Sequence, residues 1–380
     1  MPVNESSPSL RVAVIHEWWA EFGGSEKVTN QILEIFPDAV LFALTNLSGR
    51  EFTPSGHKIN TSFLDYLPIK RSKILTAMCA PIAFRTLTLK HFDLVISSSH
   101  TFSHTARMPR SKKTLYISYV HTPPRVLWAS DLDKRGGFLM NKFALQVARR
   151  IDRKLGNHVD FLSSNSYEIQ SRILRSWGRQ SDVIWPPVSI PALTSIRDSE
   201  VAPNFPFQVG EYLLSAGRFV DYKNHEFCLQ IAESTQIPIV FMGGGTPSKS
   251  LTKAISNSSV EVVVLKGVTN YEWKAILKNA RCLLFPVHED FGMTPVESIA
   301  LGTPVIALGK GGALDYIQDG VNGFCIDDLD IDKWSTIVKR GDYDTFDKVE
   351  MLNSVQKFSV EAFRIKFSRW VLKSLETHTG

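Results

Sequence analysis

Short apolar runs that end in polar or turn residues recur along the first half of the chain. The first run is followed by a glycine turn and the helical pattern VTNQILEIF, and NKFALQVARRIDRKL occupies a later gap. Strands that alternate with helices predict an α/β fold with a mainly parallel sheet. The expected strands are RVAVIHE (11–17), FDLVISSS (92–99), KTLYISYVH (113–121), VDFLSSNS (159–166) and DVIWPPV (182–188).

A second series of apolar runs begins after SIPALTSIRDSEVAPNFPF (189–207), a Pro- and Ser-rich stretch that we interpret as a linker. The runs are EYLLSAGR (211–218), IPIVFMGGG (237–245), VEVVVLKG (260–267), ARCLLFP (280–286) and TPVIALG (303–309). We therefore predict two Rossmann-like domains, 1–190 and 191–357, and a closing helix over 358–380 that packs back toward the N-terminal domain. The length of 380 residues also exceeds the roughly 250 to 300 at which a single core stops growing.

The amino-acid composition favours a globular protein over a disordered, disulfide-rich or membrane-spanning one. Apolar content of 43% and charged content of 21% indicate a globular chain without low-complexity tracts or repeats. The four cysteines are far apart and lack CxxC or zinc-type spacing, so we expect a reducing compartment and neither a disulfide framework nor a structural metal. The segment MPVNESSPSL is polar, so we do not expect it to be a signal peptide, and no apolar run approaches the roughly 20 residues that span a bilayer.

Charge is distributed unevenly between the two halves. Residues 1–190 hold 24 Lys and Arg against 15 Asp and Glu, whereas residues 191–380 hold 19 against 23. A basic half suggests an anionic partner: nucleic acid, a phosphorylated substrate or an anionic membrane surface. Solvated charge scatter is the alternative. Nucleic acid is disfavoured because the sequence shows no interleaving of aromatic and basic residues and no recognition motif.

Two loops in the first half follow predicted strands and carry candidate chemistry. In EFGGSEK (21–27), glycines permit close backbone approach, and the next helix offers its N-terminus to an anion, although an ordinary tight turn explains the same residues. In YVHTPPRVLW (119–128), two prolines make a rigid loop that holds His121 at the ligand edge of the sheet; a structural His is the alternative.

The second half places cations and carboxylates after its strands. Arg218 and Lys223 flank a turn after the first strand, where they could clamp a diphosphate, although two surface cations are common. In HEDFGMTPVESIALGTPVIALGKGG (288–312), Glu289 and Glu297 are eight residues apart, and Pro295 marks a helix start that places Glu297 in the first turn. Carboxylates accept hydrogen bonds from vicinal sugar hydroxyls. As an alternative, acidic residues are favoured in the first turn of any helix, which would explain one of the two glutamates but not the whole set of residues.

The chain resembles the retaining glycosyltransferases of family 4, which have the GT-B fold, and in particular the bacterial mannosyltransferase-type enzymes of O-antigen and exopolysaccharide assembly. The segments that carry this resemblance span nearly the whole chain, and the E-x7-E pattern is the most specific of them. They include GGSEKV, INTSFLDYLP, FDLVISSSH, YVHTPPRVLW, VIWPPV, the Arg-x4-Lys pair, FMGGG and LLFPVHEDFGMTPVESIALGTPVIALGKGGALDYIQDGVNGF. The resemblance implies two Rossmann-like parallel-sheet domains that face a central cleft, with the acceptor bound by the first and the nucleotide sugar by the second.

Roles follow from the resemblance position by position. Glu289 would hold hydroxyls of the donor hexose, Arg218 and Lys223 would neutralise its diphosphate, and His121 would touch the sugar near the reacting centre; these four form the expected catalytic set. Glu297 would hold the ribose hydroxyls. The expected donor-binding set is completed by Gly24, Gly292, Met293, Thr294, Gly311 and Gly312, and in FMGGG we expect Gly243 and Gly245 to be turn residues.

The chemistry of the residues agrees with this resemblance. Preorganised cations stabilise the charge that develops on a leaving phosphate without a metal, so we expect no cofactor and no metal. Asp328-Leu329-Asp330 has DxD spacing but lies in an acidic turn that we interpret as surface. The resemblance implies front-face attack assisted by the leaving phosphate. A retaining glycosidase would instead need two carboxyl groups about 5 to 5.5 Å apart, and the cationic pair favours a phosphorylated donor.

The expected activity is transfer of a hexose, mannose from GDP-mannose by resemblance, to a polyprenyl-diphosphate-linked or growing glycan. We expect a cytoplasmic protein, peripheral at the inner face of the cytoplasmic membrane, with LPIKRSKIL (67–75) and RMPRSKK (107–113) facing anionic lipid or the acceptor diphosphate. The alternatives are another GDP- or UDP-sugar donor, an epimerase-like or phosphorylase-like enzyme on the same fold, and a non-catalytic sugar-nucleotide-binding protein.

Overall fold

The structure, a computed structural model, describes residues 10–20, 23–108, 114–129, 142–190 and 205–379. These residues form two compact units: an N-terminal unit of residues 1–187 and 363–380, and a C-terminal unit of residues 188–362. The expected linker at 189–207 lies mostly outside the described residues, as do Glu21 and Phe22 of the glycine turn and part of the basic segment 107–113. From the sequence we placed the end of the first domain at 190 and the start of the closing helix at 358, and the compact units end at 187 and 362.

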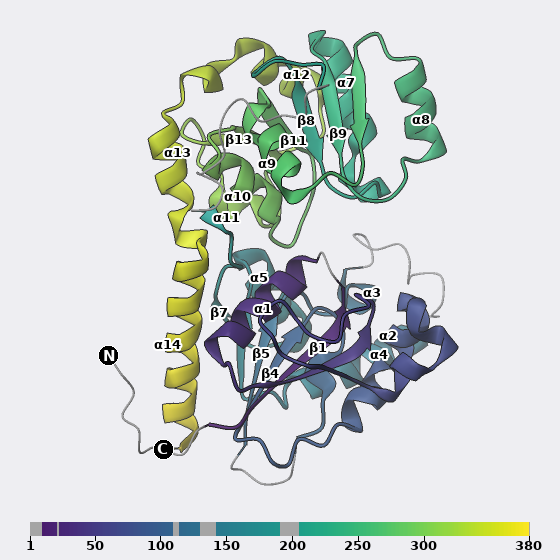
Figure 1. The fold of residues 1–380 in the computed structure, drawn as a ribbon, viewed down its shortest axis with the longest axis vertical. Coiled ribbons are helices and arrows are strands. Elements are labelled where there is room, and N and C mark those ends of the chain that lie inside the picture. Colours follow the sequence, from purple (N-terminus) through teal and green to yellow (C-terminus); the bar gives the residue numbers. More distant parts are fainter. Residues whose placement is uncertain (1–9, 21–22, 109–113, 130–141, 191–204, 380) are drawn as a thin grey trace. The chain divides into compact units, whose positions relative to one another are not determined.

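The N-terminal unit is built on a sheet of seven strands among the described residues, every neighbouring pair of which is parallel (Figure 1). The order across the sheet is β3 (Ile59–Thr61), β2 (Val40–Asn46), β1 (Val12–Trp19), β4 (Leu94–Ser99), β5 (Leu115–Val120), β6 (Phe161–Ser164) and β7 (Asp182–Val183). Its helices are α1 (Gly24–Ile35), α2 (Lys73–Arg85), α3 (Arg125–Trp128), α4 (Lys142–Gly156) and α5 (Tyr167–Trp177), with 3-10 turns η1 (Phe63–Tyr66), η2 (Pro68–Arg71) and η3 (Ser103–Thr105).

Both faces of this sheet are covered, which explains why its strands are apolar at consecutive positions. All eight residues of β1 are buried. Val12 and Val14 belong to a core shared with α1, and Ala13 and Ile15 to a core on the opposite face shared with α2 and α5. A strand buried on both sides loses the alternation of a half-exposed strand, so a continuous apolar run is what a parallel sheet requires.

The C-terminal helix α14 (Val360–Thr379) adds its apolar stripe to the N-terminal unit. Phe363, Phe367, Trp370 and Val371 are at helical spacing and join the core that contains α1. Tyr119 of β5 lies against Phe363 and Phe367, with ring centroids 6.0 and 6.3 Å apart respectively. The last helix of the chain is therefore part of the core formed by its first strand.

The C-terminal unit has a sheet of six strands among its described residues, again parallel at every pairing (Figure 1). The order is β10 (Val262–Leu265), β9 (Ile239–Met242), β8 (Leu213–Ala216), β11 (Cys282–Phe285), β12 (Val305–Leu308) and β13 (Gly323–Ile326). Its helices are α7 (His225–Thr235), α8 (Lys249–Ser256), α9 (Asn270–Asn279), α10 (Met293–Ala300), α11 (Ala313–Tyr316), α12 (Ile331–Arg340) and α13 (Lys348–Val355), with η4 (Asp221–Lys223), η5 (Asp342–Thr345) and η6 (Gln356–Phe358).

The two sheets confirm the prediction of an α/β fold with two Rossmann-like halves. All ten predicted strands are present in the structure. The strands β2, β3 and β13 were not among those predicted from the sequence. The four cysteines are free, with Cys228 and Cys282 in the core of the C-terminal unit. Among the described residues, every helix is too short or too polar to cross a bilayer.

Each sheet reverses its winding once, and this reversal positions the candidate sites. In the N-terminal unit β2 and β3 extend on one side of β1, and β4 to β7 on the other; in the C-terminal unit β9 and β10 extend on one side of β8, and β11 to β13 on the other. Loops diverge from the carboxyl ends of the two central strands at such a reversal and leave room for a ligand. The switch points are therefore β1/β4 and β8/β11.

Candidate functional site

The β8/β11 switch point brings together two of the predicted residues. Lys223 comes from the turn after β8 and Glu289 from the loop after β11, and Lys223 Nζ donates to Glu289 Oε1 at 2.5 Å. Both side chains remain partly accessible, at 12% and 19% of their full exposure. Lys223 Nζ also lies 5.2 Å from the ring centroid of Phe285, at the end of β11. A cation and a carboxylate thus meet where this type of sheet binds ligands.

The turn that carries Lys223 is held in place from the helix that follows it. Asn224 adopts a left-handed conformation and donates to the carbonyl of Pro286 at 2.6 Å, which ties the turn to the loop after β11. The imidazole of His225 contacts Ser215 Oγ at 2.8 Å and the carbonyl of Arg218 at 3.2 Å. Burial lowers the pKa of His225. The neutral imidazole therefore fixes both ends of the turn without adding charge beside Lys223.

Gly243 is required by close packing, which differs from the turn role that we predicted. A Cβ at Gly243 would stand 1.7 Å from the carbonyl oxygen of Gly217, so the chain after β9 passes directly against the chain after β8. Gly245 does adopt a left-handed φ of 92°. Only a glycine at 243 allows the turn with Arg218 and Lys223 to lie where it does.

Arg218 lies at the same edge but is not part of the ion pair. Its side chain is exposed and one guanidinium nitrogen donates to the hydroxyl of Tyr222 at 3.1 Å. Lys223 Nζ lies 5.7 Å from the ring centroid of the same Tyr222, and a guanidinium and an ammonium are both suited to bind an anion. The predicted clamp is compatible with this geometry, and the role of Arg218 stays a prediction.

The glycine loop after β12 is joined to the Glu289 loop by main chain. Glu289 and Gly311 form a parallel bridge, and the amide of Gly312 donates to the Glu289 carbonyl at 2.9 Å. Gly311 has φ of 66°, and a Cβ there would lie 2.2 Å from the Glu289 carbonyl oxygen; a Cβ at Gly312 would lie 2.3 Å from Phe291 Cα. These glycines are needed to fix the backbone from which the Glu289 side chain projects.

Helix α10 carries the second glutamate, but not where the sequence suggested. Gly292 is the N-cap, and Met293 and Thr294 are the first two helical residues. The first turn contains no acid, because Glu297 is the fifth residue of the helix. The expectation that Glu297 lies in the first turn is wrong, since the helix begins two residues before Pro295. Preference for the helix dipole therefore does not explain Glu297.

The remaining predicted residues, His121 and Gly24, belong to the N-terminal unit. His121 directly follows β5, is only 9% exposed, and its Nε2 lies 2.9 Å from Ser98 Oγ on β4. Gly24 is the first residue of α1, with Gly23 as its N-cap. Thr29 on the same helix donates to Ser98 Oγ at 2.8 Å. His121 and α1 therefore meet through one buried serine at the β1/β4 switch point.

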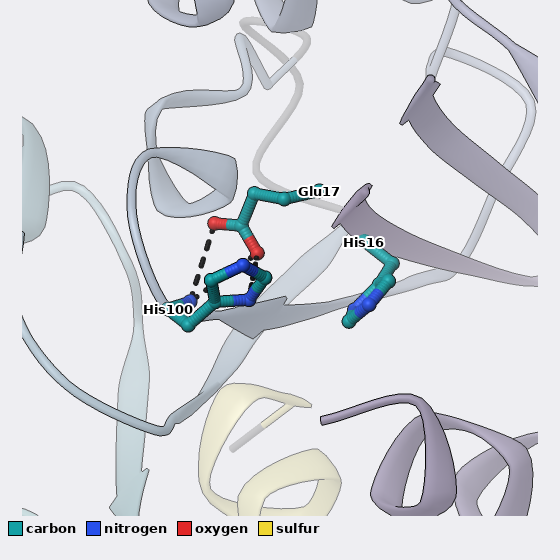
Figure 2. A group of neighbouring side chains, drawn as sticks. All are labelled: His16, Glu17 and His100. Carbon is teal, nitrogen blue, oxygen red and sulfur yellow. Dashed lines mark hydrogen bonds and ion pairs between the residues drawn. The ribbon is translucent and has the colours of Figure 1, made fainter. Parts of the chain in front are cut away.

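A cluster that sequence analysis missed lies at this switch point. It consists of His16 and Glu17 near the end of β1 and His100 directly after β4 (Figure 2). One ligand atom from each residue lies within 4.8 Å of the others, which is close enough for one metal ion. The signal in the sequence was a polar His-Glu pair inside the otherwise apolar VAVIHEWW, because a buried charge requires partners.

Glu17 is fully buried and surrounded by hydrogen-bond donors. The amides of Thr101, Phe102 and Ser103 donate to Oε1 at 2.9, 3.0 and 2.9 Å, and the amide of His100 lies 3.2 Å from both oxygens. His100 Nδ1 lies 2.8 Å from Oε2, and Figure 2 shows the imidazole directly against the carboxylate. The carboxylate thus closes the turn after β4 and fixes the orientation of the His100 ring.

The three side chains of this cluster differ in their preferred charge. The nearby imidazole and the donated hydrogen bonds outweigh desolvation and lower the pKa of Glu17 well below its ordinary value. At His100 desolvation is the largest single influence and lowers the pKa, but the charge and hydrogen bond of Glu17 together with the charge of Glu26 outweigh it, and the pKa is raised. Burial lowers the pKa of His16, whose Nδ1 lies 3.1 Å from Thr29 Oγ1. The surroundings therefore favour the charged form of Glu17, shift His100 toward its protonated form and shift His16 toward its neutral form.

The chain is similar in sequence to known glycosyltransferases. Residues 198–340 match the family described as Glycosyl transferases group 1. The chain is 30% identical over 283 residues to O-antigen chain mannosyltransferase C of Escherichia coli, covering 72% of this chain and 74% of that protein. It is 24% identical over 337 residues to the human alpha-1,3/1,6-mannosyltransferase ALG2, covering 79% of each.

The fold is also that of solved glycosyltransferase-type structures. Anabaena Alr3699/HepE in complex with UDP-glucose superposes with a TM-score of 0.67 at 14% identity, covering 95% of this chain and 99% of that one. At this identity the likeness shows the fold alone. Together with the coverage of the E. coli mannosyltransferase, it shows that the chain belongs to the group 1 glycosyl transferases of the GT-B fold.

Proposed function

We propose that this protein is a retaining, metal-independent hexosyltransferase of glycosyltransferase family 4 that moves mannose from GDP-mannose to a lipid-linked or growing polysaccharide acceptor in cell-surface glycan biosynthesis. The observation that carries the proposal is the pairing of Lys223 with Glu289 at the β8/β11 switch point. The names of the E. coli and human relatives support mannose as the transferred sugar.

The pair suits a nucleotide-sugar donor because its two groups recognise opposite parts of that molecule. Lys223, with the exposed Arg218 beside it, is placed to neutralise a diphosphate. Glu289 loses its cation to the phosphate when donor binds, and its oxygens are then available to hydroxyls of the hexose. Glu297 on α10 is the proposed acceptor of the ribose hydroxyls. Cations fixed before the donor arrives stabilise the leaving phosphate without reorganisation.

Retention follows from this division of roles. If both carboxylates hold hydroxyls, neither is a nucleophile, and the leaving phosphate itself takes the proton of the attacking acceptor hydroxyl on the same face of the sugar. The proton ends on the nucleoside diphosphate and the new bond keeps the configuration of the donor. The proton magnetic resonance spectrum of the first product formed is expected to show the α-anomer from an α-linked donor, and a β-product contradicts this part of the proposal.

A panel of GDP- and UDP-sugars with purified protein and an alkyl mannoside acceptor tests the donor. We expect GDP-mannose to give the highest kcat/KM, in the presence and absence of EDTA. The second candidate is transfer from a UDP-sugar, which is favoured by the UDP-glucose complex of the structurally similar Anabaena protein. Loss of activity with EDTA contradicts metal independence. Glu289→Ala is expected to abolish transfer, and an unchanged rate would contradict the assignment of the site.

An exposed apolar surface on the N-terminal unit supports a membrane-associated acceptor. The large side chains of this surface, which we call the α2 surface, are Phe63, Tyr66, Leu67, Ile74, Leu75, Met78 and Ile82, with exposures from 41 to 82%. Residues 63–85 also carry four Lys or Arg against one acid, Asp65. Apolar side chains mixed with cations fit the interface of an anionic bilayer. We therefore place the protein peripherally at the inner face of the cytoplasmic membrane.

Sedimentation with vesicles tests this placement. Wild-type protein is expected to sediment with vesicles containing phosphatidylglycerol at low salt and to remain in the supernatant with phosphatidylcholine alone. Met78→Ser with Ile82→Ser is expected to weaken binding about tenfold or more, since each change removes an exposed apolar side chain. Val349→Ser, an equally exposed apolar position of the C-terminal unit, is the control. Equal binding by all variants contradicts the α2 surface as the contact.

The remaining alternatives predict different products. A non-catalytic binding protein binds the donor without releasing nucleoside diphosphate, and an epimerase-like or phosphorylase-like enzyme converts a labelled sugar nucleotide without extending a glycan. Chromatography of the labelled sugar distinguishes all three. The cations and carboxylates present at the predicted positions favour transfer.

A further inference from the structure

The Glu17–His100 pair at the β1/β4 switch point is not used by the proposed donor chemistry. It lies in the N-terminal unit, at the carboxyl ends of the two strands where that sheet reverses its winding. By the geometry of such sheets this is a ligand position in its own right. The question is which of the three side chains in Figure 2 can reach a ligand, and of what charge.

His100 is the accessible member of the cluster. Its side chain is 25% exposed, whereas Glu17 is completely buried and His16 is completely buried behind it. With Nδ1 against the Glu17 carboxylate, Nε2 is the nitrogen that can meet a ligand. Glu17 already accepts from four amides, so it is occupied as a support for the turn and for the imidazole. Glu17 is a positioning residue.

Charged groups of both signs surround His100. Besides Glu17, the groups that act on it electrostatically are Glu26 of α1, which raises its affinity for a proton, Lys73 of α2, which lowers it, and the neutral His16. Glu26 is itself held by Ser25 Oγ and the amide of Ala20. The His121 ring lies 6.2 Å from the His100 ring. The Glu17 carboxylate, 2.8 Å from Nδ1, favours the protonated imidazole, so the part of His100 that remains exposed can donate a hydrogen bond to an anion.

The same position is connected to helix α2 through the core of the N-terminal unit. Trp18 lies between them: its ring centroid is 5.3 Å from that of His100, Lys73 Nζ lies 5.8 Å from the Trp18 ring, and its indole nitrogen donates to Thr76 Oγ1 at 2.9 Å. Trp18 is only 6% exposed and Thr76 is fully buried, so this connection runs through the core to the helix that carries the exposed α2 surface.

We propose that His100, oriented by Glu17, binds an anionic phosphate group of a lipid-linked acceptor. This inference rests on the proposed function and names a residue on the acceptor side of the reaction. Protonated imidazole donates a charge-assisted hydrogen bond to a phosphate oxygen, which is one of the stronger contacts available to a partly buried group.

Two acceptors that differ only in the anion test the inference: mannose linked to farnesyl diphosphate, and farnesyl α-mannoside without phosphates. With GDP-mannose, wild-type protein is expected to prefer the diphosphate acceptor in kcat/KM. His100→Gln is expected to reduce that preference about tenfold to a hundredfold, as loss of a charge-assisted hydrogen bond requires. The KM for GDP-mannose is expected to stay the same. His100→Lys, which keeps a cation, is expected to retain part of the preference.

His104 offers a matched control. Its Nε2 lies 3.0 Å from Asp152 Oδ1 in a pair that is fully sealed from solvent, so His104→Gln removes an imidazole beside a carboxylate in the same unit without touching a ligand position. His104→Gln is expected to lower stability and leave the acceptor preference unchanged. Glu17→Gln, which releases the imidazole, is expected to reduce the preference as His100→Gln does.

Three outcomes separate this inference from its alternatives. An unchanged preference in a folded His100→Gln protein overturns it. Binding of zinc chloride by wild-type protein in calorimetry, lost in both His16→Gln and His100→Gln, also overturns it and assigns the cluster to a metal. Absence of transfer by wild-type protein to either acceptor with every GDP- or UDP-sugar refutes the proposed function itself, whereas transfer without any role for His100 refutes only the acceptor contact.

Discussion

The two switch points of this molecule both pair a carboxylate with a cation, but they hold the carboxylate differently. The side chain of Glu289 contacts Lys223, and both partners keep part of their exposure. Glu17 is completely buried and accepts four amide hydrogen bonds besides its contact with His100. A ligand can exchange with the first pair, whereas the second carboxylate cannot leave its donors.

The difference teaches how to separate a binding group from a supporting one in parallel sheets. A partly accessible carboxylate that contacts a lysine side chain costs little to release from it, so it suits substrate binding. If a carboxylate enclosed by main-chain amides moved away, all of those amides would lose their hydrogen-bond acceptor. Such a carboxylate is therefore suited to be a fixed support for its neighbour. Removal of a charge at the β8/β11 switch point should therefore lower kcat, whereas removal of the Glu17 charge should lower the free energy of unfolding.

Lys223→Met is expected to have the largest effect. Removal of the cation proposed to face the leaving phosphate should lower kcat about a hundredfold or more, with little change in thermal stability. Lys333→Met is the matched control, because Lys333 pairs with Asp328 at 2.7 Å on the exposed surface of the same unit. A Lys223→Met protein with at least half of wild-type kcat would show that the C-terminal pair is merely structural.

Glu17→Gln is expected to act on stability in the N-terminal unit. The substitution puts an uncharged side-chain amide where four main-chain N–H groups donate to a carboxylate. The free energy of unfolding should therefore fall by about 2 to 3 kcal/mol in urea titrations. Glu51→Gln removes a carboxylate from an exposed pair with Lys58 and should change it by less than about 1 kcal/mol. If the two variants lose equal stability, the enclosed carboxylate is not the support inferred above.

Gly311→Ala tests the backbone beneath Glu289. Both Gly311 and Gly320 have left-handed φ, of 66° and 77°, but a Cβ would meet the Glu289 carbonyl at 2.2 Å in the first and nothing within 4 Å in the second. Gly320→Ala should therefore cost only the strain, about 1 kcal/mol, and Gly311→Ala about 1 to 2 kcal/mol more. Calorimetric melting and donor KM measure both. Matching behaviour of the two variants would count against the close approach.

The pH dependence of stability gives the smallest effect. The raised pKa of His100 contributes stability that is fully present below its ordinary value of 6.5 and is lost as pH rises through the folded value. The lowered pKa of Glu17 contributes stability above its ordinary value of 4.5 that is lost toward acid. The stability difference between wild type and Glu17→Gln should therefore be largest at about pH 5 to 6.5 and smaller at pH 9.

His16 contributes to the pH dependence of stability with the opposite sign. Its lowered pKa means that the unfolded chain takes up a proton below pH 6.5 that the folded chain does not, so this group weakens stability toward acid. The effect is opposite in sign to that of His100 and is present in both proteins. A difference that grows steadily from pH 5 to pH 9 would contradict the assigned charge states.

The strands of the core were predictable because parallel sheets require continuous apolar runs. The strands that sequence analysis missed have specific reasons. β3 and β13 are three and four residues long at the sheet edges, and partly exposed positions interrupt the pattern of β2. Short edge strands gain their structure from the neighbour with which they pair, which local patterning does not record.

The sites divide in the same way. Glu289, Lys223 and the glycines could be predicted because each directly follows a strand in a recognisable pattern. Glu17 could not, since its hydrogen-bond donors are 83 to 86 residues away in the sequence. The start of α10 was misjudged because Pro295 is tolerated anywhere in the first turn, where amides lack helical partners.

The indole of Trp18 has a consequence for thermodynamic linkage. Trp18 donates a hydrogen bond to Thr76 of α2 and its ring contacts His100, the residue proposed to bind phosphate. If lipid binding shifts α2, Trp18 therefore transmits that shift to His100. Coupling between two binding equilibria is reciprocal. Whatever factor an anionic bilayer adds to acceptor affinity, the acceptor must therefore add to bilayer affinity, and the Thr76→Val protein should lose both increments together.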